Sequence, residues 1–182
     1  MIIIIGKTCS GKTAIVNRLV SKYGFNRLTT YTTRPMRKGE VNNRDYYFIS
    51  NEEFLEKVRD GFFVEWKAYK TLYGVWYYGT SYADIRNAEE NDILIITPEG
   101  YSEIKNSRID KNMKVLYIYS NRSTIKNRLS KRGDNKEEAN RRFETDTKDF
   151  KEAEKLADRI FYNNSGKNLD VVVDEILKYL EG

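Results

Sequence analysis

The chain has 182 residues, a length that suits one domain with a full hydrophobic core and is too short for two independent catalytic modules. Its 40% hydrophobic, 32% charged and 13% aromatic residues are typical of a folded globular protein, and its formal net charge of +5 is compatible with anionic ligands. One cysteine and no histidine exclude an internal disulfide, a multi-cysteine zinc site and catalysis by histidine.

Composition also bears on location and partners. No apolar run approaches the ~20 residues that a membrane-spanning helix needs, and the apolar opening at residues 1–5 is too short for a signal peptide. We therefore expect a cytoplasmic protein without a membrane partner. The basic residues are spread along the chain without an RRM, zinc-finger or basic-zipper pattern, so we do not expect nucleic acid as a partner. The sequence leaves the oligomeric state open.

The first predicted elements are a buried strand at residues 2–5 and a helix at residues 13–23 that stops at Gly24. Between them the sequence reads GKTCSGKT, which matches the phosphate-loop pattern G-x-x-x-x-G-K-[ST] in its proper strand-to-helix context. In such a loop, backbone N–H groups and the helix N-terminus bind phosphate oxygens, the lysine reaches the terminal phosphates, and the final hydroxyl binds Mg²⁺.

The loop predicts ATP and Mg²⁺ as ligands. Its predicted ATP-binding residues are Gly6, Thr8, Cys9, Ser10, Gly11, Lys12 and Thr13, of which Thr13 also binds the metal. The sequence around Cys9 offers no base to activate its thiol, which favours a small filler residue over a nucleophile or a redox switch.

Aromatic-rich runs follow, and they depart from a simple alternation of strands and helices. They predict strands at residues 45–49, 62–69 and 73–78, with a helix at residues 51–60 between the first two. This segment indicates a small β-rich insertion.

Strands and helices alternate again in the rest of the chain. Predicted helices lie at residues 82–90, 122–131, 136–156 and 169–180, and predicted strands at residues 92–97, 113–119 and 159–162. The alternation predicts an α/β fold with a mainly parallel sheet that helices cover on both faces. Arginines crowd residues 128–142 around Gly133, a pattern that predicts a mobile lid with a glycine hinge.

Several ordered motifs share one family resemblance. Residues 29–48 read TTYTTRPMRKGEVNNRDYYF, which resembles the guanylate kinase pattern Ser/Thr-x-x-x-Arg-x-x-Arg-x-Gly-Glu-x-x-x-x-Asp-Tyr-x-Phe. Similar motifs follow as GFFVEW at residues 61–66, YYGTS at residues 77–81 and RLSKRG at residues 128–133, and the resemblance extends to Asn163.

The resemblance implies a P-loop fold and transfer of a phosphoryl group from ATP to GMP or dGMP. Within a single domain of residues 1–182 it implies a core, a monophosphate-binding region and a lid. The core would take residues 1–30, 91–127 and 157–182, the monophosphate-binding region about 31–90 and the lid about 128–156.

Acceptor-binding residues follow from the same motifs. A nucleoside monophosphate carries about two negative charges, which guanidinium and hydroxyl groups bind with defined direction. The matching residues are Thr30, Arg34, Arg37, Tyr46 and Tyr78. The resemblance implies that Glu65 accepts hydrogen bonds from the guanine ring and that the hydroxyl of Thr80 meets the base carbonyl. A carboxylate suits guanine because that edge presents two adjacent donors.

The resemblance also assigns the charge-neutralising residues. Arg128, Arg132 and Arg142 match lid positions that close over the phosphates, and Asn163 matches a position on the ATP side. Arg141 is an alternative to Arg142, because one sequence does not fix the helical phase. Together with Lys12, these arginines would act by alignment and charge neutralisation, and no strong general base is needed.

Three positions depart from the family pattern. Aligned on Gly100, Ile95 and Thr97 stand where the family carries carboxylates that help to recognise guanine and to order the water shell of the metal, so Thr97 is a predicted acceptor contact. Cys9 replaces a glycine that is usual in the phosphate loop. Two alternatives stay open: a P-loop kinase for another phosphorylated acceptor, and a catalytically weak binding module. The intact phosphate loop and the three lid arginines count against the binding module.

Overall fold

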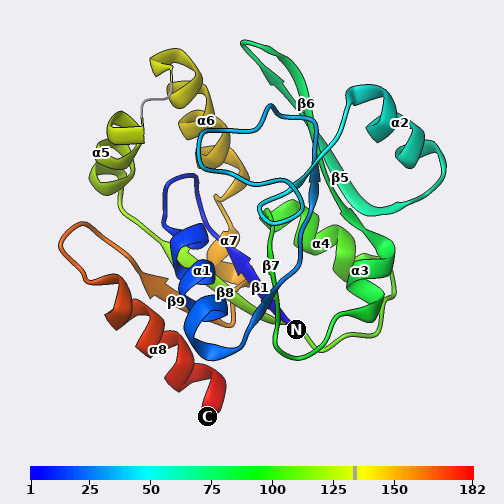
Figure 1. Cartoon of the computed structure of the whole chain (residues 1–182). Helices are drawn as coiled ribbons and strands as arrows, with labels where there is room; N and C mark the ends of the chain where they lie inside the picture. Colours follow the sequence, from blue (N-terminus) through cyan, green and yellow to red (C-terminus); the bar gives the residue numbers. More distant parts are fainter. Residues whose placement is uncertain (133–134) are drawn as a thin grey trace. The chain divides into compact units, whose positions relative to one another are not determined.

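The computed structural model describes residues 1–132 and 135–182 (Figure 1). The expected hinge Gly133 lies outside these residues. The described chain divides into two compact units by its internal contacts. The first unit consists of Met1–Arg27, Glu90–Pro98 and Asn112–Gly182, and the second consists of Leu28–Glu89 and Glu99–Lys111.

The first unit is built on a parallel sheet of five strands in the order β2-β7-β1-β8-β9. The strands are β1 (Ile2–Ile5), β2 (Asn26–Arg27), β7 (Asp92–Ile95), β8 (Lys114–Tyr119) and β9 (Arg159–Tyr162). The helices are α1 (Lys12–Tyr23), α5 (Arg122–Arg132), α6 (Lys136–Asp149), α7 (Ala153–Leu156) and α8 (Leu169–Glu181). The predicted α/β fold with a parallel sheet is confirmed.

The core of this unit explains the apolar runs in the sequence. All four residues of β1 are buried, as expected for a central parallel strand that is covered on both faces. Helices α1 and α8 contribute Leu19 and Ile176 to one hydrophobic cluster that also contains Ile4 of β1 and Leu116 of β8. The central strand is therefore closely packed, and the phosphate loop begins where it ends.

The second unit contains a four-stranded sheet in the order β4-β3-β6-β5. Its strands are β3 (Tyr31–Thr32), β4 (Tyr47–Phe48), β5 (Phe63–Thr71) and β6 (Gly74–Ser81). Its helices are α2 (Asn51–Arg59), α3 (Tyr82–Asn87) and α4 (Pro98–Asn106). The first residue of α4, Pro98, is still counted with the first unit. Strands β5 and β6 form an antiparallel hairpin with an irregular register between Phe63 and Glu65.

Phe54 of α2 is the centre of the second unit. Its side chain is fully buried and stacks on Phe63 and Tyr77, with ring centroids 4.5 Å and 5.3 Å away. Gly79 lies under these rings, and a Cβ atom there would come within 2.9 Å of Phe63 and 3.0 Å of Phe54. The aromatic content of the insertion thus forms a core of its own.

Some sequence predictions of helices and strands were wrong. The predicted strand at residues 92–97 ends at Ile95, because Pro98 begins the unpredicted helix α4, where proline suits the first turn. The predicted helix at residues 136–156 is interrupted, since α6 ends at Asp149 and Phe150 packs against Tyr117 of β8 with ring centroids 6.0 Å apart. The two-residue strands β2 and β3 were also missed.

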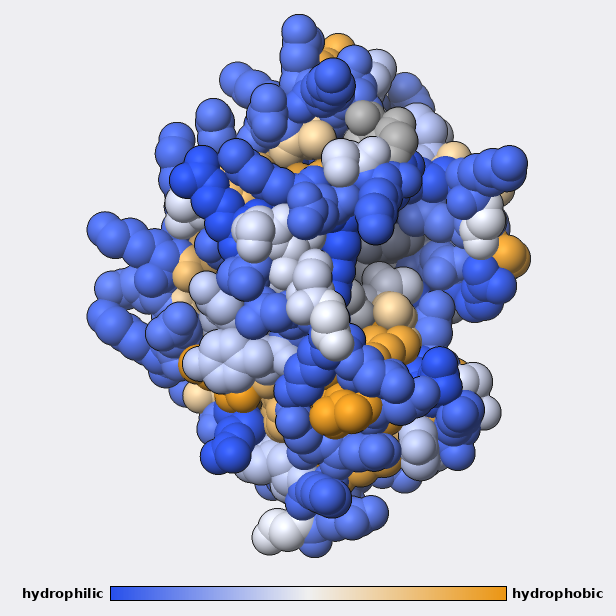
Figure 2. All heavy atoms as spheres, turned by 90° about the vertical axis from the view of Figure 1, so that its left-hand side faces the viewer, coloured by the Kyte–Doolittle hydropathy of each residue, from blue (hydrophilic) through white to orange (hydrophobic). Residues whose placement is uncertain are grey.

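The surface agrees with the high content of charged residues. On the face that Figure 2 draws, hydrophilic side chains predominate and hydrophobic atoms gather in small separate patches. Within residues 1–132 and 135–182, no helix has both the length and the apolar composition of a membrane span.

The aromatic core of the second unit gives a stability prediction. Phe54→Ala removes the buried ring between Phe63 and Tyr77, and we expect it to lower the free energy of unfolding by about 3–5 kcal/mol. Leu55→Ala changes an exposed neighbour on the same helix and should cost less than about 1 kcal/mol. Both tryptophans of the sequence, Trp66 and Trp76, lie in this unit, so urea denaturation followed by tryptophan fluorescence measures it directly. Equal effects of the two substitutions would contradict the packing described here.

Candidate functional site

The phosphate loop of the first unit is closely confined at both ends. A Cβ atom on Gly6 would lie 2.6 Å from the carbonyl oxygen of Ile118, and one on Gly11 would lie 2.2 Å from Nδ2 of Asn163. Gly11 also has a φ of 100° and caps the N-terminus of α1. Glycine is required at these two positions because any side chain would collide with β8 or with Asn163.

Cys9 adopts an unusual backbone conformation inside the loop. Its φ is 56°, in the left-handed region that costs a residue with a side chain roughly 1–2 kcal/mol. Glycine adopts this conformation without that cost. Cys9 therefore stands at a position whose backbone conformation suits glycine, and its side chain adds strain there.

A buried hydrogen-bond network supports the loop from the side of β8 and β9. The carbonyl oxygen of Ser10 accepts hydrogen bonds from Nδ2 of Asn163 at 2.7 Å, from the guanidinium of Arg128 at 3.1 Å and from the hydroxyl of Ser120 at 3.2 Å. Arg128 also donates to the carbonyl oxygens of Cys9 and Asn163, each at 3.1 Å. Arg128, which was predicted as a lid arginine, and Asn163, which was predicted on the ATP side, thus both lie at the loop and donate to its carbonyl groups.

Lys12 folds back over the loop. Its Nζ donates to the carbonyl oxygens of Gly6 at 2.5 Å and Lys7 at 2.9 Å. Burial lowers the pKa of Lys12 to about 8, Asp146 opposes that change, and Arg132 adds to it. A bound phosphate would favour the charged ammonium. Lys12 is therefore a group that can bind an anion, and its own charge depends on pH.

A cavity of about 480 Å³ adjoins the loop within the first unit. Its lining includes Cys9, Lys12, Thr13, Arg128, Arg132 and Asn163. The exposed Thr13 is the second residue of α1, where its hydroxyl is free to meet a ligand at the helix N-terminus. The volume suits a nucleotide-sized ligand, and the basic lining suits its phosphates.

The remaining lid arginines bind a carboxylate of their own helix. Arg141 donates to both oxygens of Glu138 at 2.9 Å and 2.7 Å, and Nε of Arg142 donates to Oε1 at 2.9 Å. Burial alone would raise the pKa of Glu138, but the two guanidinium groups lower that pKa to about 2. Both arginines share one partner, so this arrangement does not choose between them.

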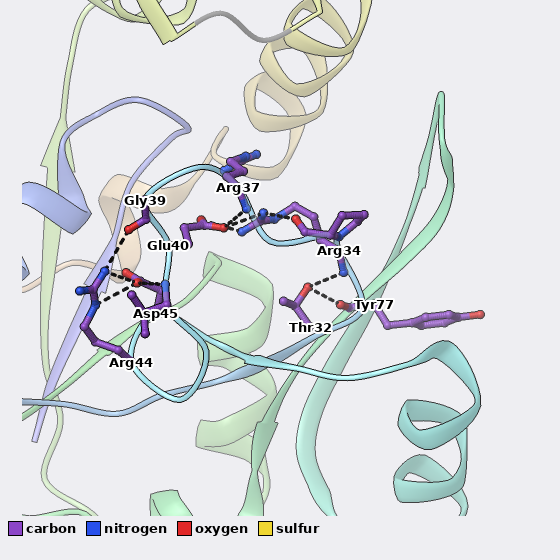
Figure 3. A network of polar contacts seen from close by, with 10 residues as sticks. Thr32, Arg34, Arg37, Gly39, Glu40, Arg44, Asp45 and Tyr77 are labelled. Atoms are coloured by element: carbon purple, nitrogen blue, oxygen red, sulfur yellow. Dashed lines mark hydrogen bonds and ion pairs between the residues drawn. The ribbon is translucent and has the colours of Figure 1, made fainter.

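The second unit contains a preformed basic corner, shown in Figure 3. The buried Arg34 makes a bidentate pair with Glu40 at 2.8 Å and 3.0 Å, and Glu40 also accepts a hydrogen bond from the backbone N–H of Arg37 at 2.7 Å. Burial would raise the pKa of Glu40, but these hydrogen bonds hold it below its ordinary value. The pair fixes the chain between the two predicted arginines.

Two predicted tyrosines lie beside this corner. The guanidinium carbon of Arg34 is 5.5 Å from the ring centroid of Tyr46, and the rings of Tyr46 and Tyr78 meet edge to face at 6.1 Å.

Thr30 contributes its carbonyl oxygen, which accepts a hydrogen bond from the backbone of Tyr47 at 2.9 Å. Thr97 belongs to the first unit and is not grouped with the other predicted acceptor residues.

The two predicted base contacts touch each other. The hydroxyl of Thr80 donates to Oε1 of Glu65, and the two residues are only 2% and 8% exposed. Burial raises the pKa of Glu65 to about 7, with Glu103 and Glu99 adding to the effect and the hydrogen bond from Thr80 opposing it. Glu65 is therefore a buried acceptor that adjacent N–H donors would stabilise in its ionised form.

Sequence reasoning missed three functional neighbours of these residues. Glu40 stands in the quoted acceptor motif, so its pairing with Arg34 was open to prediction from opposite charges in one short loop. Ser120 and Asp146 carry no such signal. Each touches the phosphate loop through a contact between residues more than 100 positions apart, which only the fold brings together.

Comparisons with known proteins fit this geometry. The sequence profile described as guanylate kinase matches residues 1–181. A guanylate kinase of Legionella pneumophila (strain Paris) is 34% identical over 131 residues, covering 70% of this chain and 60% of the relative. One of Clostridium tetani (strain Massachusetts / E88) is 30% identical over 142 residues, covering 76% of this chain and 66% of the relative. The chain thus spans about three fifths to two thirds of the length of these curated relatives.

A solved structure gives the same fold. The crystal structure of guanylate kinase from Anaplasma phagocytophilum aligns with a TM-score of 0.69 at 20% sequence identity, covering 100% of this chain and 84% of that one. At this identity the similarity concerns the fold alone.

The position of Lys12 predicts how ATP binding depends on pH. The ligand-free pKa is about 8, and bound phosphates raise it, so affinity should change little up to about pH 7 and weaken increasingly above that pH. Between pH 7 and pH 9 we expect the dissociation constant for ATP to rise about tenfold, which calorimetric titration would measure. Lys12→Arg keeps its charge throughout this range and serves as the control. A wild-type profile as flat as that of Lys12→Arg would contradict the assignment.

Proposed function

The chain belongs to the guanylate kinase family, and from this premise we propose that it transfers the terminal phosphoryl group of ATP to GMP or dGMP. One observation carries the choice of acceptor: Glu65 is a buried carboxylate in contact with the hydroxyl of Thr80. The carboxylate matches the adjacent N–H donors of guanine, and the hydroxyl of Thr80 would meet the base carbonyl after turning away from Glu65. The basic corner of the same unit supplies binding groups for the phosphate of a nucleotide.

The donor side uses the phosphate loop and its neighbours. Backbone N–H groups of residues 6–13 and the N-terminus of α1 bind the phosphates of ATP, and the ammonium of Lys12 reaches the terminal groups. Arg132 lines the adjoining cavity and adds positive charge. Arg128 acts chiefly by holding the loop carbonyls, because its guanidinium is bonded to Cys9, Ser10 and Asn163.

The residues present also fit Mg²⁺. This ion usually retains water and takes only one or two protein ligands beside substrate phosphates. The exposed hydroxyl of Thr13, at the cavity, suits that role, and the part of the chain that the structure describes has no cluster of three or more acidic, cysteine or histidine residues that would form a separate protein cage. When bound, the ion would neutralise charge on the phosphates.

The acceptor phosphate would bind at the basic corner. Arg34 uses hydrogen bonds to Glu40 and Pro35 to fix its guanidinium beside Tyr46, while the side chain of Arg37 extends from the same loop (Figure 3). Because an acceptor phosphate is already ionised near neutral pH, positioning and charge neutralisation suffice for its attack. No basic residue is needed to remove a proton.

The base site explains the preference for guanine. A carboxylate whose pKa is about 7 is only partly ionised at neutral pH, and two adjacent N–H donors of guanine would stabilise its charged form. Adenine lacks this pair of donors, so it would leave a buried carboxylate unsatisfied at a cost of roughly 1–3 kcal/mol. The same argument disfavours a pyrimidine monophosphate as the best acceptor.

Acceptor specificity gives the decisive test. We expect GMP or dGMP to have the highest kcat/KM among GMP, dGMP, AMP, CMP and UMP in a coupled assay of ADP formation with ATP and Mg²⁺. Glu65→Gln replaces one acceptor oxygen by an amide donor and should lower kcat/KM for GMP about ten- to a hundredfold, the equivalent of roughly 1–3 kcal/mol.

The control is Glu56→Gln, which removes an exposed carboxylate from α2 of the same unit and should leave kcat/KM within about twofold. A preference of the wild type for AMP or a pyrimidine nucleotide would favour a P-loop kinase with another acceptor. ADP formation that none of the five acceptors stimulates would favour the binding module.

A further inference from the structure

A carboxylate of α6 occupies part of the phosphate loop. Oδ2 of Asp146 accepts a hydrogen bond from the backbone N–H of Thr8 at 2.5 Å. Backbone N–H groups of this loop are the donors that bind phosphate oxygens in the phosphate-loop motif. Asp146 lies 138 positions from Thr8 in sequence, so the contact exists only because α6 packs near the loop within the first unit.

The charges around Asp146 resemble those that a phosphate would meet. Lys12 and Lys7 of the loop attract the carboxylate, whereas Asp149 on the same helix repels it. Tyr117 of β8 is close enough for its pKa to be raised in part by Asp146. Burial raises the pKa of Asp146, and the hydrogen bond from Thr8 opposes that change. A carboxyl oxygen of Asp146 therefore takes the hydrogen bond of an N–H group that ATP would use, within the electrostatic influence of two lysines of the same loop.

We propose that Asp146 is an internal competitor for the donor-phosphate site: its carboxylate holds the loop of the ligand-free chain, and ATP displaces it. The inference rests on the proposed use of the loop for ATP. In this proposal, Asp146 and a phosphate group cannot bind the N–H group of Thr8 at the same time. A molecule in which Asp146 is bound there therefore has a lower affinity for ATP.

A different role for Asp146 makes the opposite prediction. If the carboxylate shaped the loop for ATP or bound the metal, its removal would weaken the binding of nucleotides. If it competes with phosphate, its removal strengthens binding, because the free loop is then the only ligand-free state. The sign of the change in affinity therefore separates the two roles.

The experiment measures binding without any acceptor or metal. Inorganic tripolyphosphate and ATP are titrated calorimetrically into the wild type, Asp146→Asn and Asp146→Ala at pH 7. We expect Asp146→Ala to lower both dissociation constants about tenfold. This change corresponds to a wild type in which Asp146 occupies the loop in about nine molecules of ten. Asp146→Asn should have a smaller effect in the same direction, because its amide oxygen still accepts from Thr8 without a charge.

The matched control is Glu144→Gln, which removes one negative charge from an exposed position on the same helix. Its dissociation constants should stay within about twofold of the wild type. Unchanged or weakened binding in both Asp146 variants would overturn the inference, and so would an equal gain in Glu144→Gln, which would indicate a general effect of charge.

A second measurement uses the wild type alone, so it does not depend on the folding of a variant. The side-chain carboxyl carbon of Asp146 is titrated by NMR with and without tripolyphosphate. Displacement into water should lower its pKa towards the ordinary value of about 3.9. A pKa that rises when the anion binds would mean that Asp146 stays beside it, and would overturn the inference.

Neither experiment involves GMP, so the inference and the acceptor assignment can fail separately. Tighter tripolyphosphate binding together with a preference for another monophosphate would contradict the proposed acceptor and leave the role of Asp146 intact. Loss of tripolyphosphate binding in Lys12→Ala is expected, since that residue belongs to the phosphate loop itself.

Discussion

The shape of the phosphate loop depends on the hydrogen bonds that its carbonyl groups accept. A loop that turns several N–H groups towards an anion must turn carbonyl oxygens the other way, and in a buried position each of them needs a donor. Here the carbonyl oxygen of Ser10 receives donors from Arg128, Asn163 and Ser120, which come from three separate stretches of the chain. The sheet of the first unit brings these stretches together, and its close-packed isoleucine core keeps them in place. Binding chemistry at the loop is therefore inseparable from the packing beneath it.

Charged groups in both units are prepared before any ligand arrives. Arg34 is oriented by Glu40 and Arg141 and Arg142 by Glu138, and each of these carboxylates has a lowered pKa because guanidinium groups surround it. Glu65 is the reverse case, since burial raises its pKa and Thr80 supplies one hydrogen bond. Orientation in advance reduces the entropy that binding must overcome. In the proposed function, Glu65 discriminates between bases by accepting hydrogen bonds from the two adjacent donors of guanine.

Local sequence patterns predicted the parts of this molecule that are themselves local. The phosphate loop was found because its residues are contiguous and its strand and helix adjoin it, and the acceptor motif because its arginines and tyrosines lie close in the chain. Helix α4 was missed, although it begins at Pro98 and proline suits the first turn of a helix. The break after Asp149 depends on Phe150 meeting Tyr117, and the contact of Asp146 with Thr8 depends on the whole fold. Such tertiary contacts leave no trace in a single sequence.

The position of Cys9 has a practical consequence for chemical labelling. It is the only cysteine of the sequence, it lines the cavity beside the phosphate loop, and a left-handed backbone holds it there. A thiol-reactive reagent therefore has one possible cysteine target, at a known position, without any engineering of the chain. A nucleotide bound at the loop as proposed would lie beside Cys9, so its binding should slow the alkylation of that thiol. Labelling of Cys9, the residue that departs from the family pattern in the loop, would therefore measure how much of the phosphate loop is occupied.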